Sequence, residues 1–256
     1  MITSTSNENI KHVCMLVKNA KARRQEGGFV VEGERIASEI PKDTLKECYV
    51  TEDFAAGGKI NEVFPYPVDP IVVSQQVFKK MSDTQSPQGI LCVCEREKES
   101  LDDFLRARVE GSLRLLVLEK IQDPGNLGTM VRTAEGAGFD AIIADEGTVD
   151  LYNPKVARST MGSLFRVPVF YVDDAAAAVD VLKKEKITTY AAHLNGENDY
   201  KDEVYDERLA ILIGNEGSGL SEDITKKADR LVRIPMKGKL ESLNAAVAAA
   251  ILMYNA

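Results

Sequence analysis

The chain has little of what metal sites and nucleophilic catalysis use: among its 256 residues there are no tryptophans, two histidines and four cysteines. Cys92 and Cys94 are closer together than the usual spacing of zinc ligands, and only His12 and His193 are available to complete a site. A metal is therefore not expected. No plausible Ser–His or Cys–His pair is evident, and the cysteines are expected to be reduced thiols.

Long apolar runs are also missing. No stretch approaches the roughly 20 apolar residues of a membrane span. The first residues, MITSTSNENIKHVC, lack the apolar core of a signal peptide. With 44% hydrophobic and 28% charged residues the composition is that of a globular chain, not a disordered one. We expect a cytoplasmic protein without a membrane partner.

Positive charge is scarce overall, because the formal net charge is −8. A protein that coats nucleic acid by charge alone is therefore excluded. Basic residues nevertheless gather near the start of the chain, where they form either a solvated helix face or a local RNA-binding face. These residues are Lys11, Lys18, Lys21, Arg23 and Arg24.

The pattern of apolar segments predicts an α/β protein. Residues 1–97 alternate short strands and helices, which is typical of a small α/β domain. Residues 98–112 are dense in charge and are expected to form a solvated linker with a short helix. In residues 113–256, continuous Val/Ile/Leu runs alternate with helical segments, and this predicts a mostly parallel sheet covered on both faces. Ligands of such sheets bind beyond the carboxyl ends of the strands.

The loop after the first of these strands reads QDPGNLGTMVR. Asn126 is predicted at the N-cap of the following helix, and Arg132 lies six residues further on. An arginine near a helix N-terminus is a candidate anion contact. The alternative is that Asn126 only caps and Arg132 makes a surface ion pair.

The second loop, GNEGSGLSED, places Glu216 among glycines that let the backbone approach a ligand. Its spacing is not G-x-G-x-x-G, which argues against a nucleotide-binding oxidoreductase. The third loop, in IPMKGKLESLN, precedes an alanine-rich helix that Ser242 or Asn244 caps. The small side chains of that helix predict a tightly covered or interface helix.

The segments DPGNLGTMVRTAEGAGF, LIGNEGSGLS and IPMKGKLESLNAAVAAAILMY resemble, in order, the three motifs of the SpoU/TrmH branch of the SPOUT RNA methyltransferases. They cover most of residues 115–256. The first 95 residues are similar, more loosely, to the substrate-binding domain that precedes the catalytic domain in many members. The resemblance implies an α/β fold with a C-terminal trefoil knot, which no composition or periodicity could predict.

The resemblance also implies a site. The bound cofactor would be S-adenosyl-L-methionine, in a pocket that matches Leu194, Gly196, Gly214, Ile234, Met236 and Leu243. The polar active-site positions of the family match Asn126, Arg132, Glu216, Ser242 and Asn244. Arg132 would be either the base or a group that holds the phosphate or the developing alkoxide.

The implied reaction is methyl transfer to the 2′-hydroxyl of an RNA ribose. Ribosomal RNA is expected rather than transfer RNA, and a homodimer through the catalytic domain is implied. Two alternatives within the same fold remain open: methylation at a base atom, and an RNA-binding member without activity.

Overall fold

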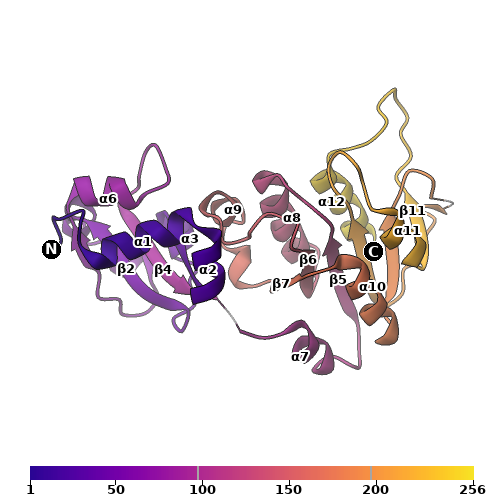
Figure 1. Ribbon diagram of the computed structural model, residues 1–256, viewed down its shortest axis with the longest axis horizontal. Helices are drawn as coiled ribbons and strands as arrows, with labels where there is room; N and C mark the ends of the chain where they lie inside the picture. The colour runs from indigo at the N-terminus through magenta and orange to yellow at the C-terminus, as the bar shows by residue number, and fades with distance from the viewer. Residues whose placement is uncertain (97, 197) are drawn as a thin grey trace. The chain divides into compact units, whose positions relative to one another are not determined.

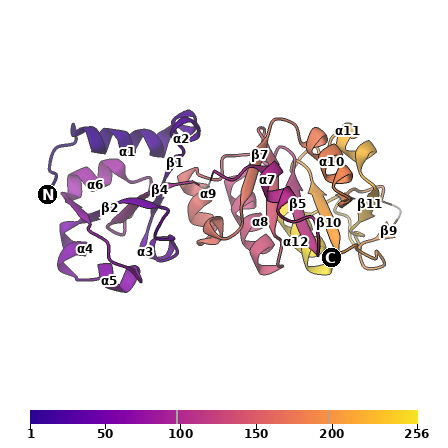
Figure 2. The ribbon, with the colours of Figure 1, turned by 90° about the horizontal axis from the view of Figure 1, so that it is seen from below.

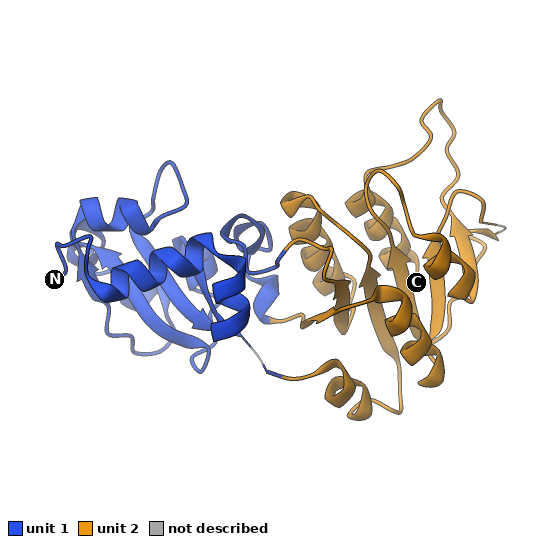
Figure 3. Cartoon of the chain, viewed as in Figure 1, with its two compact units in different colours: residues 1–98, 150–165 blue, residues 99–149, 166–256 orange. Residues whose placement is uncertain are grey.

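The computed structural model describes residues 1–96, 98–196 and 198–256, and the chain forms two compact units (Figure 3). Unit 1 comprises Met1–Lys98 and Asp150–Phe165, and unit 2 comprises Glu99–Val149 and Arg166–Ala256. The predicted end of the first domain, residue 97, lies outside the described residues. None of the helices in the described ranges is long and apolar enough to cross a membrane.

Unit 1 is built on a mixed four-stranded sheet (Figure 1). The order is β1-β4-β2-β3; β4 pairs antiparallel with both neighbours, and β2 pairs parallel with β3. The strands alternate with helices along the chain, as the sequence predicts for a small α/β domain. Their bounds are Gly28–Glu32 (β1), Leu45–Thr51 (β2), Ile71–Val73 (β3) and Ile90–Glu95 (β4).

Helices α1 and α6 cover one face of this sheet and bury an apolar core against it. Asn7 caps α1 by accepting hydrogen bonds from the amides of Asn9 and Ile10. The helices of unit 1 are α1 (Glu8–Lys18), α2 (Ala20–Glu26), α3 (Glu34–Ala37), α4 (Glu52–Ala56), α5 (Ile60–Val63), α6 (Gln75–Met81) and α9 (Pro154–Ser159).

The start of the chain forms two helices that meet at Asn19. This residue is extended, with φ −120° and ψ 105°, so it ends α1. Its side chain accepts hydrogen bonds from the amides of Lys21 (2.9 Å) and Ala22 (3.2 Å) and so begins α2. The break turns α2 so that Arg23 points into unit 1.

Arg23 is buried, at 4% exposure, which corrects its prediction as an RNA contact. Its guanidinium donates to the carbonyl oxygens of Leu16 (2.7 Å) and Val17 (3.1 Å), at the end of α1. The same group lies 2.7 Å from the Asp150 carboxylate. Arg23 therefore holds the helix end and the 150–165 segment within unit 1.

The other predicted RNA-contacting residues are at the surface. Lys11 pairs with Glu8 at 2.7 Å, within the same helix. Lys18, Lys21 and Arg24 are exposed. These four, without Arg23, remain the candidate RNA-binding face.

Unit 2 contains the predicted parallel sheet, with seven strands in the order β7-β6-β5-β10-β8-β11-β9. Among the described residues, each pair of neighbouring strands in this sheet is parallel. The chain moves outward from β5 through β6 to β7 and then crosses to the other side of β5, where β10, β8, β11 and β9 lie in that spatial order. The bounds are Leu113–Leu118 (β5), Ala141–Asp145 (β6), Val169–Val172 (β7), Thr188–Ala192 (β8), Asn198–Asp199 (β9), Arg208–Ile213 (β10) and Arg230–Arg233 (β11).

Helices cover both faces of this sheet (Figure 2), as the continuous apolar strands predict. One face carries α7 (Leu101–Arg106), α10 (Ala175–Lys184) and α11 (Glu222–Lys227), which share one apolar core. The other carries α8 (Pro124–Gly136) and α12 (Ala245–Asn255), which pack on each other.

Helix α7 corrects the expectation of a solvated linker. Phe104 and Leu105 are buried in the core of unit 2, and the Phe104 ring lies 5.1 Å from that of Phe170. The charged residues around α7 hide this apolar pair in the sequence. The segment therefore belongs to unit 2 and is not a free connector.

The four cysteines are free thiols, as predicted. Cys48, Cys92 and Cys94 are buried in the sheet of unit 1. Burial raises the pKa of the Cys94 thiol, which disfavours the reactive thiolate.

Replacing Arg23 by alanine is expected to lower the free energy of unfolding of the chain. The change leaves Asp150 and two helix-end carbonyls without their partner, and breaking a buried pair costs about 3–5 kcal/mol. Lys18→Ala, at the surface of α1, is the control and should cost less than about 0.5 kcal/mol. Urea denaturation followed by circular dichroism measures both, and equal midpoints for the two variants would refute the structural role of Arg23.

Candidate active site

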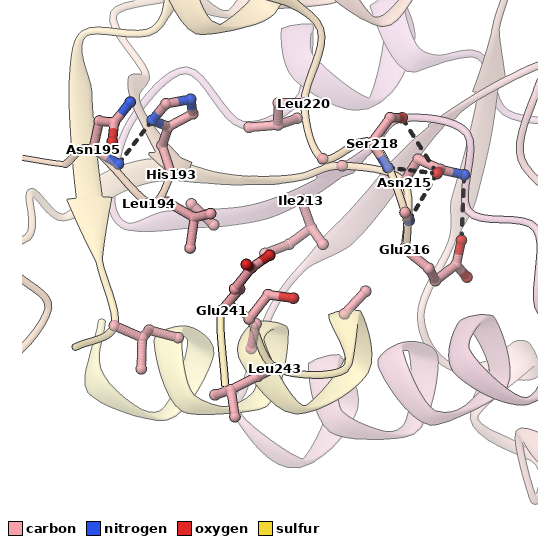
Figure 4. A pocket seen from close by; sticks show the side chains of 18 of the residues that line it. His193, Leu194, Asn195, Ile213, Asn215, Glu216, Ser218, Leu220, Glu241 and Leu243 are labelled. Atoms are coloured by element: carbon pink, nitrogen blue, oxygen red, sulfur yellow. Dashed lines mark hydrogen bonds between the residues drawn. The ribbon is translucent and has the colours of Figure 1, made fainter. Parts of the chain in front are cut away.

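A cavity of about 420 Å³ opens at the carboxyl ends of three adjacent strands of unit 2 (Figure 4). Ala192, Ile213 and Val232, at or near the ends of β8, β10 and β11, form its base. The loop that leads into α12 lines another side of it. This is the edge at which ligands of parallel sheets bind.

Five of the six residues matched to the cofactor pocket line this cavity: Leu194, Gly214, Ile234, Met236 and Leu243. The sixth, Gly196, is not among the lining residues. A Cβ on Gly196 would lie 2.8 Å from the backbone nitrogen of Arg233, so this glycine lets the loop after β8 pass closely over β11.

At Gly214 two stretches of backbone pass very close to each other. A Cβ at this position would lie 2.1 Å from the Leu220 nitrogen and 2.2 Å from the Gly219 carbonyl carbon. No side chain fits there, because both neighbours are backbone atoms. The loop from Gly214 to Leu220 therefore folds back tightly on the end of β10, and this closes one wall of the cavity.

A chain of hydrogen bonds joins three loops beside the cavity. The Asn126 amide donates to Glu216 Oε1 at 2.9 Å, and the Asn244 amide donates to Asn126 Oδ1 at 2.9 Å. Asn244 Oδ1 in turn accepts from the amide of Ala246 and caps α12. Residues separated by 90 and 118 positions in the sequence thus meet in one polar cluster.

The position of Asn126 in its helix differs from the prediction. Asp123, not Asn126, is the N-cap of α8, and its carboxylate accepts from the Asn126 backbone amide at 2.8 Å. Pro124 at the first helical position suits this arrangement. Because Asp123 caps the helix, the Asn126 side chain is available to bond both neighbouring loops.

Burial acts to raise the pKa of Glu216, but donated hydrogen bonds outweigh it and lower the pKa below its ordinary value of 4.5. The donors are the Asn126 side chain and the backbone amides of Glu216, Asp123 and Gln122. Glu216 is thus a carboxylate at neutral pH. A carboxylate only accepts, so it fixes the Asn126 NH₂ toward itself and the Asn126 oxygen toward Asn244.

The two remaining predicted catalytic residues, Ser242 and Arg132, lie in different places. Ser242 lines the cavity, and Glu216 also lines it. Arg132 is exposed, does not line the cavity and has no hydrogen-bond or ion-pair partner among the described residues. Six residues after Asn126, it is rotated about 120° around the axis of α8. Arg132 therefore lies on a different side of α8 from Asn126.

Sequence reasoning missed Asn215, which organises the second loop. Its side-chain amide donates to the Lys120 carbonyl at 2.8 Å, and its oxygen accepts from the amides of Gly217 and Ser218. An asparagine between a strand end and a glycine-rich turn is the available signal. Buried Glu119 was also missed; it accepts from the Ser221 amide at 2.7 Å, at the start of α11.

His193 and Glu241 are further lining residues that the pattern did not select. The His193 ring accepts a hydrogen bond from the Asn195 backbone amide at 3.2 Å. Across the described parts of the chain, no three His, Cys, Asp or Glu side chains are grouped as a metal site would need.

Sequence comparison identifies the two parts of the chain. A model of the SpoU rRNA Methylase family matches residues 114–254, and one of the MRM3-like substrate binding domain matches residues 7–92. The 23S rRNA (guanosine(2553)-2'-O)-methyltransferase RlmP of Bacillus subtilis is 35% identical over 256 residues, covering 99% of this chain and 98% of that protein.

Solved structures agree along almost the whole chain. The SpoU methyltransferase AviRb of Streptomyces viridochromogenes, in complex with AdoMet, has a TM-score of 0.84 and 25% identity, with 97% of this chain and 96% of that chain covered. The AdoMet-bound rRNA methyltransferase of Sinorhizobium meliloti has a TM-score of 0.79 and 26% identity, with 99% and 95% covered. With three motif loops joined beside one cavity and similarity from end to end, the chain belongs to the SpoU rRNA methylase family.

Proposed function

We propose that this chain transfers a methyl group from S-adenosyl-L-methionine to a ribose 2′-hydroxyl of ribosomal RNA. One observation carries the proposal: the hydrogen-bonded chain from Glu216 through Asn126 to Asn244 lies beside a cavity that five of the six matched cofactor positions line. The choice of ribosomal RNA follows the B. subtilis relative, whose name specifies 23S rRNA and a 2'-O position.

The residues around the cavity suit this cofactor. Leu194, Ile213 and Leu243 offer apolar surface for an adenine ring, and Leu194 is 59% exposed. Between residues 235 and 243 no backbone group makes a hydrogen bond to a described residue, so amides and carbonyls of the loop are available to adenosine. We assign these groups to cofactor binding.

The bound cofactor supplies a methyl group on a sulfonium, already activated for in-line displacement. Much of the protein's work is therefore to align the ribose hydroxyl. Asn126 and Asn244 hold the polar cluster rigid, and Ser242 lies at the cavity wall where a ribose hydroxyl would be positioned. Glu216 is a poor base for that hydroxyl, because donated hydrogen bonds lower its pKa.

Arg132 contributes positive charge in this scheme. A guanidinium stays protonated in proteins, so it does not accept the hydroxyl proton readily. It instead stabilises the developing alkoxide or holds the phosphate of the target nucleotide.

The position of Arg132 supports a homodimer. Arg132 is exposed, does not line the cavity of its own subunit and lies on a different side of α8 from Asn126, so we infer that it reaches an RNA bound at the cavity of a second copy. Val247 (48% exposed) and Tyr254 (67% exposed) leave apolar surface on the neighbouring helix α12, where such a copy would pack. The second subunit thus completes the site.

Three further parts of the proposal rest on the family resemblance. The chain end forms a trefoil knot beside the cavity, the enzyme works in the cytoplasm, and the N-terminal unit presents the RNA. Lys11, Lys18, Lys21 and Arg24 provide a local basic face for this in a chain of net charge −8.

The proposed reaction is tested by incubating the protein with methyl-labelled S-adenosylmethionine and unmodified ribosomal or transfer RNA, followed by nucleoside analysis. We expect a labelled 2′-O-methylnucleoside from ribosomal RNA, and at least about a 100-fold lower rate for Arg132→Ala. Label on a base instead of a ribose would show that the enzyme methylates a base atom. Cofactor binding without transfer to either RNA would identify an RNA-binding member that lacks activity.

A shared site makes a quantitative prediction for mixed subunits. Arg132→Ala and Glu216→Gln are each expected to be inactive. After co-refolding in equal amounts, half of the dimers are mixed, and each mixed dimer has one intact site, so about a quarter of the wild-type activity should return. If Arg132 served its own subunit, mixing would restore nothing.

Gly214→Ala is expected to abolish cofactor binding, because the added Cβ meets backbone atoms at 2.1 and 2.2 Å and forces the wall of the cavity to move. Gly217→Ala is the matched control in the same loop, since its Cβ would meet only the Asn215 side-chain oxygen, at 3.6 Å. Calorimetric titration with S-adenosylmethionine measures both. Similar affinities for the two variants would contradict the tight passage at Gly214.

A further inference from the structure

Two glutamate carboxylates line the cavity, but only one of them accepts hydrogen bonds from other groups of the protein. Glu216 accepts hydrogen bonds from Asn126 and from backbone amides. Glu241 makes no hydrogen bond or ion pair with any described residue. The charge of Glu241 is thus available to a ligand, and the roles assigned above do not use it.

Glu241 is placed to act on a ligand. It lies three residues before the Asn244 cap of α12, next to Ser242 and Leu243, which also line the cavity. In Figure 4 its carboxylate points into the cavity, toward Leu194 and Ile213. Glu241 is exposed to solvent, but the aliphatic side chains on the cavity side of its carboxylate reduce the screening of its charge there and strengthen its interaction with a cation bound in the cavity.

The described lining contains no permanently charged basic side chain. Neither lysine nor arginine is among the lining residues, and Lys237 and Lys239 of the same loop lie outside the set. Such a cavity disfavours phosphate-bearing nucleotides and favours a ligand that carries positive charge.

We propose that Glu241 is the residue that distinguishes the methyl donor from the demethylated product. This rests on the proposed function. S-adenosylmethionine has a sulfonium charge that S-adenosylhomocysteine lacks, while the two share the adenosine and amino-acid parts. A free carboxylate in the cavity stabilises the donor more than the product, so it favours exchange of product for donor after each transfer.

The test compares three ligands by calorimetric titration of the full chain. S-adenosylmethionine and S-adenosylhomocysteine differ at the sulfur, and sinefungin has an amine in place of the methylated sulfur and therefore keeps a positive charge. Glu241→Gln removes the charge and keeps the shape of the side chain. Glu207→Gln is the matched control, because Glu207 precedes β10 at the opposite end of the strand from the cavity and is exposed.

Glu241→Gln is expected to lower the affinity for S-adenosylmethionine and for sinefungin by about tenfold. The affinity for S-adenosylhomocysteine should fall by less than about twofold. Glu207→Gln should change none of the three. Circular dichroism melting curves confirm that both variants remain folded.

Two results would overturn the proposal. If the affinity for all three ligands falls equally, Glu241 contacts the ammonium group that they share. If no affinity changes, Glu241 contacts neither that ammonium group nor the charge at the sulfur position. A wild-type chain that binds none of the three would overturn the proposed function itself, which separates that failure from a failure of Glu241.

Discussion

The hydrogen bond from Asn126 to Glu216 is the interaction on which the arrangement of the site depends. An asparagine side chain has a donor end and an acceptor end, so one residue bonds to two loops only if its orientation is fixed. The ionised Glu216 provides that orientation, because it cannot donate. The Asn126 oxygen then receives Asn244, and the start of α12 is set by the charge state of a residue in a different loop.

This cluster depends in turn on backbone packing. Glu216 reaches Asn126 because the second loop folds back at Gly214, and Asn215 fastens the loop to the carbonyl of Lys120. Glu119 holds the far end of the loop through the Ser221 amide. The polar side chains therefore converge because the strand ends are parallel neighbours, and the glycine and asparagine set the distances between them.

The sequence predicted the parallel sheet and the meeting of its loops, because continuous apolar strands leave few other arrangements. It did not predict which side chain caps α8, since Asp123 and Asn126 are both good caps three positions apart. Arg23 was misassigned for a related reason. Its neighbours Lys21 and Arg24 are at the surface, and only the break at Asn19 turns Arg23 inward.

Contacts between segments far apart in the chain were the hardest features to predict from the sequence. The 150–165 segment lies between two strands of the parallel sheet in the sequence, yet it packs in unit 1, where Asp150 pairs with Arg23 127 residues away. Helix α7 looked like a linker because charge surrounds Phe104 and Leu105. In both cases local composition describes the surface of a segment, and the partner that buries its other face lies elsewhere in the chain.

The loop from residue 235 to 243 links cofactor binding in the cavity to the polar cluster beside it. A protein loop normally satisfies its backbone groups with turns or caps. This loop makes none of these bonds to described residues, yet it ends at the firmly placed cap Asn244. Its polar groups stay available while its end is fixed relative to Glu216 and Asn126. A ligand bound there therefore orders the loop against a cluster that is already in position, so cofactor binding and alignment of the ribose hydroxyl are physically coupled.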